Sequence, residues 1–397
     1  MKPALLYLTH RIPYPPNKGD KIRSYHMLRF LSQHYRIFLG TFVDSEQDWQ
    51  YRDVLASLCE GNCYFSPLYP KRARFKSLMH LFNPPLTLAY YHQHKFQKWV
   101  ERIIEDHQIV RVLVFSSALA QYVEAQQSLR RVMDFVDMDS DKWLQYSKSK
   151  GWPAKWIYKR EGMSLLAYEK KIANMFDISF FVSRAERDLF HRRAPESKDK
   201  VTYFNMGVDA DYFSPERSYV NPYANGAPII VFTGAMDYWA NVDAVTWFSE
   251  SIFPLVRKAK PDTLFYIVGA RPHSAVLKLA KLPGITVTGQ VEDIRPYLAH
   301  ARVCVAPLRI ARGVQSKILE GMAMQKIIIA SEEAAAAIEA TPGREFLVAN
   351  NADDFARTVV LALNQEHPTD MASAARRTIL EKYDWQANLN ALLGALQ

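Results

Sequence analysis

The sequence has few cysteines and no long uncharged apolar run, and each absence excludes a class of protein. Three cysteines among 397 residues are a small and odd number, so we expect reduced thiols and no disulfide framework. A membrane-spanning helix needs about 20 consecutive apolar residues, and no stretch of the chain reaches that length. The first apolar stretch ends at His10, which is too short for a secretory signal. We therefore expect a cytoplasmic protein.

Motifs of several binding proteins are also missing. Cys59 and Cys63 have no second ligand pair at the spacing of a zinc finger, so no zinc site is expected. The chain has no convincing internal repeat and no recognised nucleic-acid motif, which argues against a solenoid and against a nucleic-acid partner.

The chain does have a large apolar fraction and an uneven distribution of charge. Hydrophobic residues make up 49% and charged residues 23% of the sequence, enough for a large core. Residues 1–210 contain 32 Lys and Arg against 22 Asp and Glu, whereas residues 211–397 contain 18 against 19. The basic excess thus lies in the first half, which predicts an anionic partner there, either a phospholipid surface or nucleic acid.

Short β-branched or aromatic runs alternate with longer amphipathic stretches, which is typical of βα units around parallel sheets. Strands are expected at residues 4–9, 37–43, 111–115, 131–136, 178–182, 201–204, 229–233, 264–268, 285–288, 303–306, 327–330 and 346–348. The Pro- and Gly-punctuated segment 211–228 predicts a linker between domains 1–210 and 229–382, and residues 383–397 predict a last helix that returns to the first domain. The fold class is α/β, with two doubly wound domains that place the carboxyl ends of two sheets across a crevice.

The most informative motif is PLRIARGVQSKILEGMAM in the second half. A strand ends near Pro307, and a helix is expected to start near Gln315 or Ser316. Helix-start amides, a hydroxyl and up to three cations suit a diphosphate, and a carboxylate one turn further along can accept the hydroxyls of a ribose. Alternatively, Lys317 and Glu320 form a Lys–Glu pair on the surface of the helix. The candidate donor-binding residues are Arg309, Arg312, Gly313, Ser316, Lys317 and Glu320.

Glycines after two other strands give weaker signals. Gly19 ends the loop after the first strand, where backbone amides and a helix start could approach a phosphate; an ordinary βα turn is the alternative. Gly234 directly follows another strand, and Asn241 is expected to cap the next helix. Both glycines are included among the donor-binding candidates.

The segment DFVDMDSDKW places alternating carboxylates after a strand. Asp137 and Asp139 could orient an acceptor hydroxyl, as could Asp20 after the first strand, and these three are the candidate catalytic residues. Binding of a divalent ion is the alternative, but Lys142 stands where a calcium loop needs a glycine. We expect no metal site.

Two segments of the basic half interleave Lys and Arg with aromatic residues. Trp152, Lys155, Trp156, Lys159 and Arg160 would share one side of a helix, a pattern suited to an anionic membrane interface. Nucleic acid is the rival partner, and a third interpretation is that the aromatics belong to the core.

The motifs together resemble a known family. NMGVDADYFSP and the motif around Glu320 resemble family 4 glycosyltransferases of the GT-B fold. RIPYPPNKGDKIRSYHMLRFL, VMDFVDMDSDKW and FTGAMDYWANVDA resemble the sugar transferases associated with PEP-CTERM/exosortase exopolysaccharide loci. The resemblance implies metal-independent, retaining transfer from a nucleoside-diphosphate sugar to a lipid-linked or polysaccharide acceptor in the interdomain cleft. It implies no cofactor and a position at the inner face of the plasma membrane.

The chain departs from the family pattern at two places. Glu320 matches the second glutamate of the E-x7-E motif, the ribose ligand, but Arg312 replaces the first. The usual R-x4-K phosphate pair is absent from Ala235–Asn241, and Lys317 with Arg309 or Arg312 is the proposed replacement. Three alternatives therefore stay open: a sugar-nucleotide 2-epimerase of the same architecture, a catalytically degenerate scaffold protein, and an RNA-binding protein.

Overall fold

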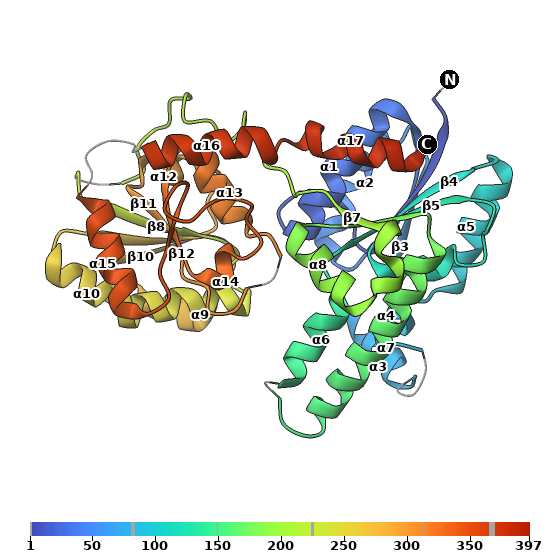
Figure 1. Ribbon diagram of the computed structural model, residues 1–397, viewed down its shortest axis with the longest axis horizontal. Helices are drawn as coiled ribbons and strands as arrows, with labels where there is room; N and C mark the ends of the chain where they lie inside the picture. The colour runs from blue at the N-terminus through green and yellow to red at the C-terminus, as the bar shows by residue number, and fades with distance from the viewer. Residues whose placement is uncertain (1, 81–83, 149, 224–225, 312, 365–369) are drawn as a thin grey trace. The chain divides into compact units, whose positions relative to one another are not determined.

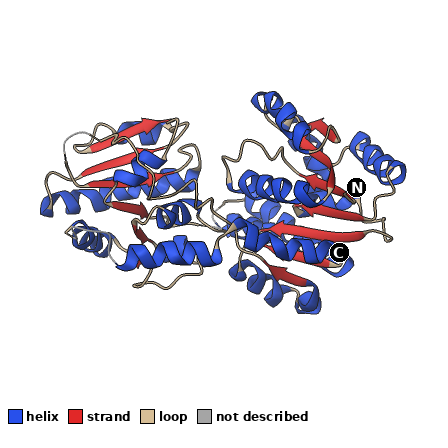
Figure 2. Cartoon of the chain, turned by 90° about the horizontal axis from the view of Figure 1, so that it is seen from above, coloured by secondary structure: helices blue, strands red, loops and turns tan. Residues whose placement is uncertain are grey.

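The computed structural model describes all of the chain except residues 1, 81–83, 149, 224–225, 312 and 365–369. The described residues form two compact units (Figure 1). Unit 1 contains Met1–Asn205 and Gln386–Gln397, and unit 2 contains Met206–Trp385. Each unit is built around one parallel β-sheet, with helices on both faces of the sheet (Figure 2).

The sheet of unit 1 has the strand order β3-β2-β1-β4-β5-β6-β7. All of its strand pairs are parallel, with Leu6 of β1 opposite Phe38 of β2 and Val112 of β4. Its central strands β1 and β2 are buried at every residue but the first because helices cover both faces. The strands are β1 (Ala4–Thr9), β2 (Arg36–Val43), β3 (Cys63–Pro67), β4 (Arg111–Phe115), β5 (Arg130–Val136), β6 (Ile178–Phe181) and β7 (Val201–Tyr203).

Helix α5 of unit 1 buries an apolar stripe against the sheet, whereas α3 packs on α4 and α6 packs on α7. In α5, Phe96, Trp99 and Val100 recur at helical spacing and are buried. The α-helices are α1 (Gly19–His34), α2 (Arg52–Leu58), α3 (Pro70–Leu78), α4 (Leu86–Tyr91), α5 (His94–Asp106), α6 (Asp139–Lys148), α7 (Ala154–Met175) and α8 (Arg184–Arg193). Short 3-10 segments are η1 (Glu46–Tyr51), η2 (Ser117–Tyr122) and η3 (Pro195–Lys200).

Unit 2 repeats the architecture with the strand order β10-β9-β8-β11-β12-β13. The strands are β8 (Ile229–Thr233), β9 (Leu264–Val268), β10 (Ile285–Gly289), β11 (Val303–Ala306), β12 (Ile327–Ala330) and β13 (Leu347–Val348). The helices are α9 (Trp239–Trp247), the π-helical η4 (Phe248–Ile252), α10 (Phe253–Ala259), α11 (Ser274–Leu279), α12 (Arg295–His300), α13 (Ser316–Ala323), α14 (Glu332–Ala335), α15 (Ala352–Leu363) and α16 (Asp370–Lys382).

The last helix, α17 (Trp385–Leu396), packs on unit 1. Arg111 of β4 donates to the carbonyl of Leu396 at 3.1 Å, and Arg130 of β5 donates to that of Ala395 at 2.9 Å. The carboxyl end of the chain is therefore tied to the amino ends of two strands of the unit 1 sheet.

The sequence-based expectation of two Rossmann-like α/β domains is confirmed. Every expected strand is present, with ends that differ by at most one residue. Strand β3 was not predicted because its short sequence, CYFSP, contains a serine and a proline. The strand lies at the edge of the sheet, where a proline is tolerated.

Two local expectations are wrong. Asn241 does not cap α9, because the helix starts two residues earlier at Trp239 and its N-cap residue is Tyr238. Trp152 does not share a helix with Trp156, because α7 begins only at Ala154, after Pro153. No helix among the described residues is long and apolar enough to span a membrane.

Candidate functional site

The candidate site of unit 2 lies where its parallel strands end. Gly234 follows β8 with φ of 155°, and Gly269 follows β9 with φ of 158°. A Cβ atom on Gly269 would lie 1.7 Å from the Gly234 carbonyl oxygen, so the two turns approach each other as only glycines permit. Lys317 of helix α13, which follows β11, lies close to the first turn: a Cβ atom on Gly234 would be 3.5 Å from the Cε atom of Lys317.

Lys317 is the candidate cation of this motif that forms no ion pair among the described residues. It is the second residue of α13, and its Nζ donates to Asn241 Oδ1 at 3.1 Å. The same Nζ lies 5.0 Å from the centre of the Phe232 ring. Asn241 in turn donates to the carbonyl of Ala235 at 2.8 Å. Sequence reasoning missed this role of Asn241, which links the loop after β8 to α13.

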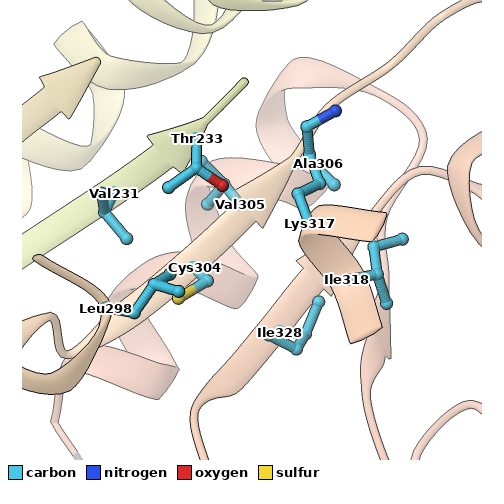
Figure 3. Close-up of a pocket in the computed structure, with 9 residues that line it drawn as sticks. All are labelled: Val231, Thr233, Leu298, Cys304, Val305, Ala306, Lys317, Ile318 and Ile328. Atoms are coloured by element: carbon cyan, nitrogen blue, oxygen red, sulfur yellow. The ribbon is translucent and has the colours of Figure 1, made fainter. Parts of the chain in front are cut away.

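A small pocket lies beneath this edge (Figure 3). Its lining is apolar except for Thr233, Cys304 and Lys317, and the centre of a water molecule can occupy about 10 Å³ of it. In Figure 3 the Lys317 side chain runs past Ala306, with its nitrogen beyond the carboxyl end of β11. The pocket is too small for a sugar, and Lys317 is one of the residues that line it.

Lys317 and Glu320 have shifted pKa values. Burial lowers the pKa of Lys317 to about 8, and the charge of Glu320 offsets this only in part. Burial raises the pKa of Glu320 to about 7, against the opposing charge of Lys317. Among the described residues neither side chain has an ion-pair partner within 4 Å. The edge thus holds a half-buried cation and a half-buried carboxylate without the oppositely charged partner that ordinarily stabilises charges taken out of water.

The other candidates of this motif lie in different surroundings. The Arg309 guanidinium is exposed and forms a bidentate pair with Asp243 of α9, with Nε 3.0 Å from Oδ2. Gly313 adopts φ of 64°, which favours glycine. Ser316 is the first residue of α13 and half-buried. Arg312 lies outside the described residues.

The carboxyl edge of the unit 1 sheet carries the other candidates. Gly19 is the first residue of α1, with open space where its Cβ would be. Asp20 accepts from Arg11 at 2.8 Å, and His10 Nε2 lies 3.6 Å from the same oxygen. Burial raises the pKa of Asp20, but the bonds and charges of His10 and Arg11 outweigh it and hold that pKa well below its usual range. Arg11 also pairs with Asp44 at 3.1 Å, so it is already neutralised.

Asp137 and Asp139 share one lysine. Lys142 Nζ lies 2.9 Å from Asp137 Oδ2 and 3.1 Å from Asp139 Oδ1. Burial lowers the pKa of Lys142, but the two carboxylates outweigh it and raise that pKa well above its usual range. Where the structure describes the chain, no three His, Cys, Asp or Glu side chains converge in a way that could hold a metal ion.

Tyr91 marks where these groups meet. Its ring lies edge-on to His10, with 5.9 Å between ring centres. Burial raises the pKa of Tyr91, Arg11 opposes the rise, and Asp44 and Asp139 add to it. Charged residues that follow β1, β2 and β5 therefore lie near this phenol, and Asp20 is linked to it through its hydrogen bond with Arg11.

Two buried acids of unit 1 were not singled out from the sequence. Asp134 at the end of β5 accepts from Arg23 Nε of α1 at 2.8 Å, and both side chains are fully buried. Glu169 of α7 accepts from the backbone and side chain of Ser140, and burial raises its pKa to about 8 against these bonds. The pairing partners are 111 and 29 residues apart in sequence, so no local pattern indicates them.

Comparison with known proteins identifies the second unit. Residues 227–365 match the family model described as glycosyl transferases group 1. The matched residues lie within unit 2, and the chain is an enzyme of the transferase class. No curated protein sequence matches the chain.

Solved structures match the whole chain. A glycosyltransferase from Rickettsia africae has a TM-score of 0.67 at 14% identity, covering 99% of this chain and 97% of that one. Sucrose-phosphate synthase from Thermosynechococcus elongatus has a TM-score of 0.69 at 13% identity, covering 99% and 98%. Anabaena HepE, in complex with UDP and glucose, has a TM-score of 0.66 at 13% identity, covering 99% and 100%. The matches establish the GT-B fold.

Proposed function

We propose that the protein transfers a sugar from a nucleoside-diphosphate donor to a lipid-linked or polysaccharide acceptor, with retention and without a metal ion. The observation that carries the proposal is the pair of Lys317 and Glu320 on α13, which are half-buried and have no ion-pair partner among the described residues. Both residues belong to the segment that matches glycosyl transferases group 1. The proposed setting is exopolysaccharide biosynthesis of the PEP-CTERM/exosortase type, which rests on the sequence resemblance.

The donor diphosphate is assigned to the start of α13. The first amides of this eight-residue helix have no partner within the helix, and the helix dipole favours an anion there. Lys317 adds a full positive charge in a site of low dielectric, where it stabilises the charge that develops on the departing diphosphate. Glu320, one turn further along, accepts hydrogen bonds from the ribose hydroxyls. Gly234 and Gly269 let the backbone approach the same ligand.

Structural neighbours support a nucleotide sugar. HepE is described in complex with UDP and glucose, and TarM in complex with UDP and fondaparinux. WaaG is described as a glycosyltransferase of lipopolysaccharide biosynthesis. By analogy we assign a nucleotide sugar to unit 2 and a saccharide acceptor to unit 1, and we place the protein at the cytoplasmic face of the membrane.

The acceptor is assigned to the carboxyl edge of the unit 1 sheet. Asp20, Asp137 and Asp139 each carry a cationic partner, and their carboxylate oxygens can accept hydrogen bonds from sugar hydroxyls. An uncharged, hydroxyl-rich ligand fits this edge because the net charge there is already balanced.

A thermal-shift panel tests the donor assignment. UDP-, GDP- and ADP-sugars are added to the wild type and to Glu320→Ala, with EDTA present. A bound donor raises the melting temperature of the wild type by mass action, and the variant loses the shift. Absence of a shift with every donor, with or without Mg²⁺, would support the scaffold alternative instead. Formation of an epimer from a donor without any acceptor would support the 2-epimerase.

A further inference from the structure

Exposed apolar side chains gather on two neighbouring segments of unit 1. On and just after α3, Phe75, Leu78 and Met79 are 71%, 51% and 75% exposed. Where α6 connects to α7, Trp152 and Trp156 are 86% and 47% exposed. Single exposed apolar residues are common, but a contiguous group indicates a surface that is covered by a partner. We call these five residues the docking face.

The two segments are linked through the start of α4. Arg160 of α7 donates to the carbonyl of Pro84 at 3.3 Å. The fully buried Glu161 accepts from the amides of Leu86 and Thr87, at 2.7 and 2.9 Å, and so holds the start of α4. Helix α3 packs on α4, and α4 in turn packs on α7. The two segments that carry the apolar side chains are therefore held together through α4.

This surface carries positive charge and lacks acidic residues. No Asp or Glu occurs in residues 61–100 or in residues 142–160. Exposed cations stand next to the apolar side chains in both segments. They are Lys71, Arg72, Arg74 and Lys76 on α3, and Lys148, Lys150, Lys155 and Lys159 on α6, α7 and their connection.

We propose that the docking face binds the surface of an anionic phospholipid bilayer. Trp and Phe side chains favour the headgroup boundary, and lysines beside them reach anionic headgroups while their stems stay apolar. The aliphatic Leu78 and Met79 gain free energy at an acyl boundary, whereas they offer a nucleic acid neither hydrogen bonds nor ring stacking. The pattern thus favours lipid over RNA.

The docking face is connected to the acceptor edge by two short helices. Helix α4 starts beside Glu161 and ends at Tyr91, next to His10. Helix α6 starts at Asp139 and ends at Lys148. At 1.5 Å per residue these helices are about 9 and 15 Å long. We therefore expect a separation on the order of 15 Å between the acceptor edge and the bilayer, which suits a lipid-linked saccharide; this last step rests on the proposed function.

Vesicle flotation tests the proposal without donor or acceptor. The full-length protein is mixed with vesicles of phosphatidylcholine alone, or of phosphatidylcholine with about one third phosphatidylglycerol, at low and high salt. We expect the wild type to float with the anionic vesicles at low salt and to be released by salt. We expect Phe75→Ser with Met79→Ser to weaken binding at least tenfold, and Lys155→Ala with Lys159→Ala to weaken it roughly thirtyfold.

A matched variant in unit 2 distinguishes binding through the docking face from non-specific adsorption to vesicles. Leu361 of α15 is 61% exposed, and Leu361→Ser is expected to leave flotation unchanged. All of the variants change exposed side chains, and an unchanged melting temperature shows that each is folded. The donor-induced melting shift in unit 2 reports the proposed function separately, because it involves no residue of the docking face.

Three outcomes would overturn the proposal. One is wild-type protein that stays unbound with anionic vesicles at low salt. Another is binding that the variants in α3 and α7 leave unchanged. The third is salt-sensitive binding to RNA through the same lysines without binding to vesicles, which would assign the surface to nucleic acid. Loss of the donor-induced shift with vesicle binding intact would reject the proposed function and leave the docking face standing.

Discussion

The carboxyl edges of both sheets carry charged side chains. Those of unit 1 form ion pairs with one another, whereas Lys317 of unit 2 forms none with the residues that the structure describes. In unit 1, Asp20 pairs with Arg11, and Asp137 and Asp139 share Lys142. In unit 2, Lys317 has a neutral amide oxygen and an aromatic ring as its nearest partners. A site for a diphosphate needs a cation that no carboxylate has already neutralised, and only the unit 2 edge offers one among the described candidates.

The difference has an energetic cost in the ligand-free protein. Desolvation disfavours the charged forms of Lys317 and Glu320, which lowers the pKa of the lysine and raises that of the glutamate. Such unfavourable burial is typical of binding sites, since the ligand supplies the missing partner. The paired groups of unit 1 contribute instead to the folded state of the free protein.

Breaking the buried pair of unit 1 is expected to have the largest effect. Arg23→Met leaves Asp134 buried without its cation, so the free energy of unfolding should fall by about 3–5 kcal/mol. Urea unfolding of unit 1 measures this loss. The matched change Arg344→Met, at an exposed arginine of unit 2, should alter it by less than about 0.5 kcal/mol. A loss as small as that of the control would show that the buried pair is not structural.

Removing the cation of unit 2 that has no described ion-pair partner should weaken ligand binding without lowering the stability of the protein. Lys317→Met is expected to weaken binding of a nucleotide sugar by roughly 100-fold, because a hydrogen bond to a charged group is lost. The ligand-free variant should be as stable as the wild type or more so, since a desolvated charge is removed. Titration calorimetry and urea unfolding measure the two quantities. Unchanged affinity would mean that the diphosphate binds elsewhere.

The stability of unit 2 should depend on pH through the same two residues. Glu320, with a folded pKa of about 7, keeps a proton that the unfolded chain loses, so stability falls as pH rises from about 4.5 to 7. Lys317, with a folded pKa of about 8, loses a proton that the unfolded chain keeps, so stability rises from pH 8 to about 10.5.

Urea titrations at several pH values measure both slopes. Glu320→Gln is expected to flatten the acid slope alone, and Lys317→Met the alkaline slope alone. Equal slopes in wild type and variants would show that these residues do not carry the shifted pKa values.

Arg309 should contribute least. Its guanidinium is exposed and already paired with Asp243, so Arg309→Ala should weaken binding of a nucleotide sugar by less than about fivefold. Calorimetry alongside Lys317→Met ranks the two cations. A loss for Arg309→Ala that equals the loss for Lys317→Met would give the phosphate-binding role to the exposed arginine.

The regular elements could be predicted from sequence because they depend on local patterns. Runs such as IIIA in β12 and ALLYLT in β1 are buried on both faces and signal central parallel strands. The start of α13 at Ser316 also agrees with the pattern around Lys317. Strand β3 could not be found this way, because half-buried residues and a proline at the edge give no clear period.

Partners within the candidate sites could not be predicted, since they depend on contacts between distant segments. Asp243 meets Arg309 across 66 residues, and Asn241 meets Lys317 across 76. A side chain at Gly269 would clash with the carbonyl oxygen of Gly234. The spacing of residues along the sequence does not reveal this clash. Sequence therefore indicated which side chains could bind an anion, and the fold shows which of them are already paired.

Proton uptake on donor binding tests the central claim most directly. Calorimetric titrations with UDP-, GDP- and ADP-glucose, whose diphosphates do not titrate near pH 8, are run at that pH in two buffers of different ionisation enthalpy. A donor that binds Lys317 raises its pKa from about 8, so the wild type should take up roughly half a proton that Lys317→Met does not. Equal proton uptake by wild type and Lys317→Met would contradict the claim that unit 2 keeps this cation free for the diphosphate.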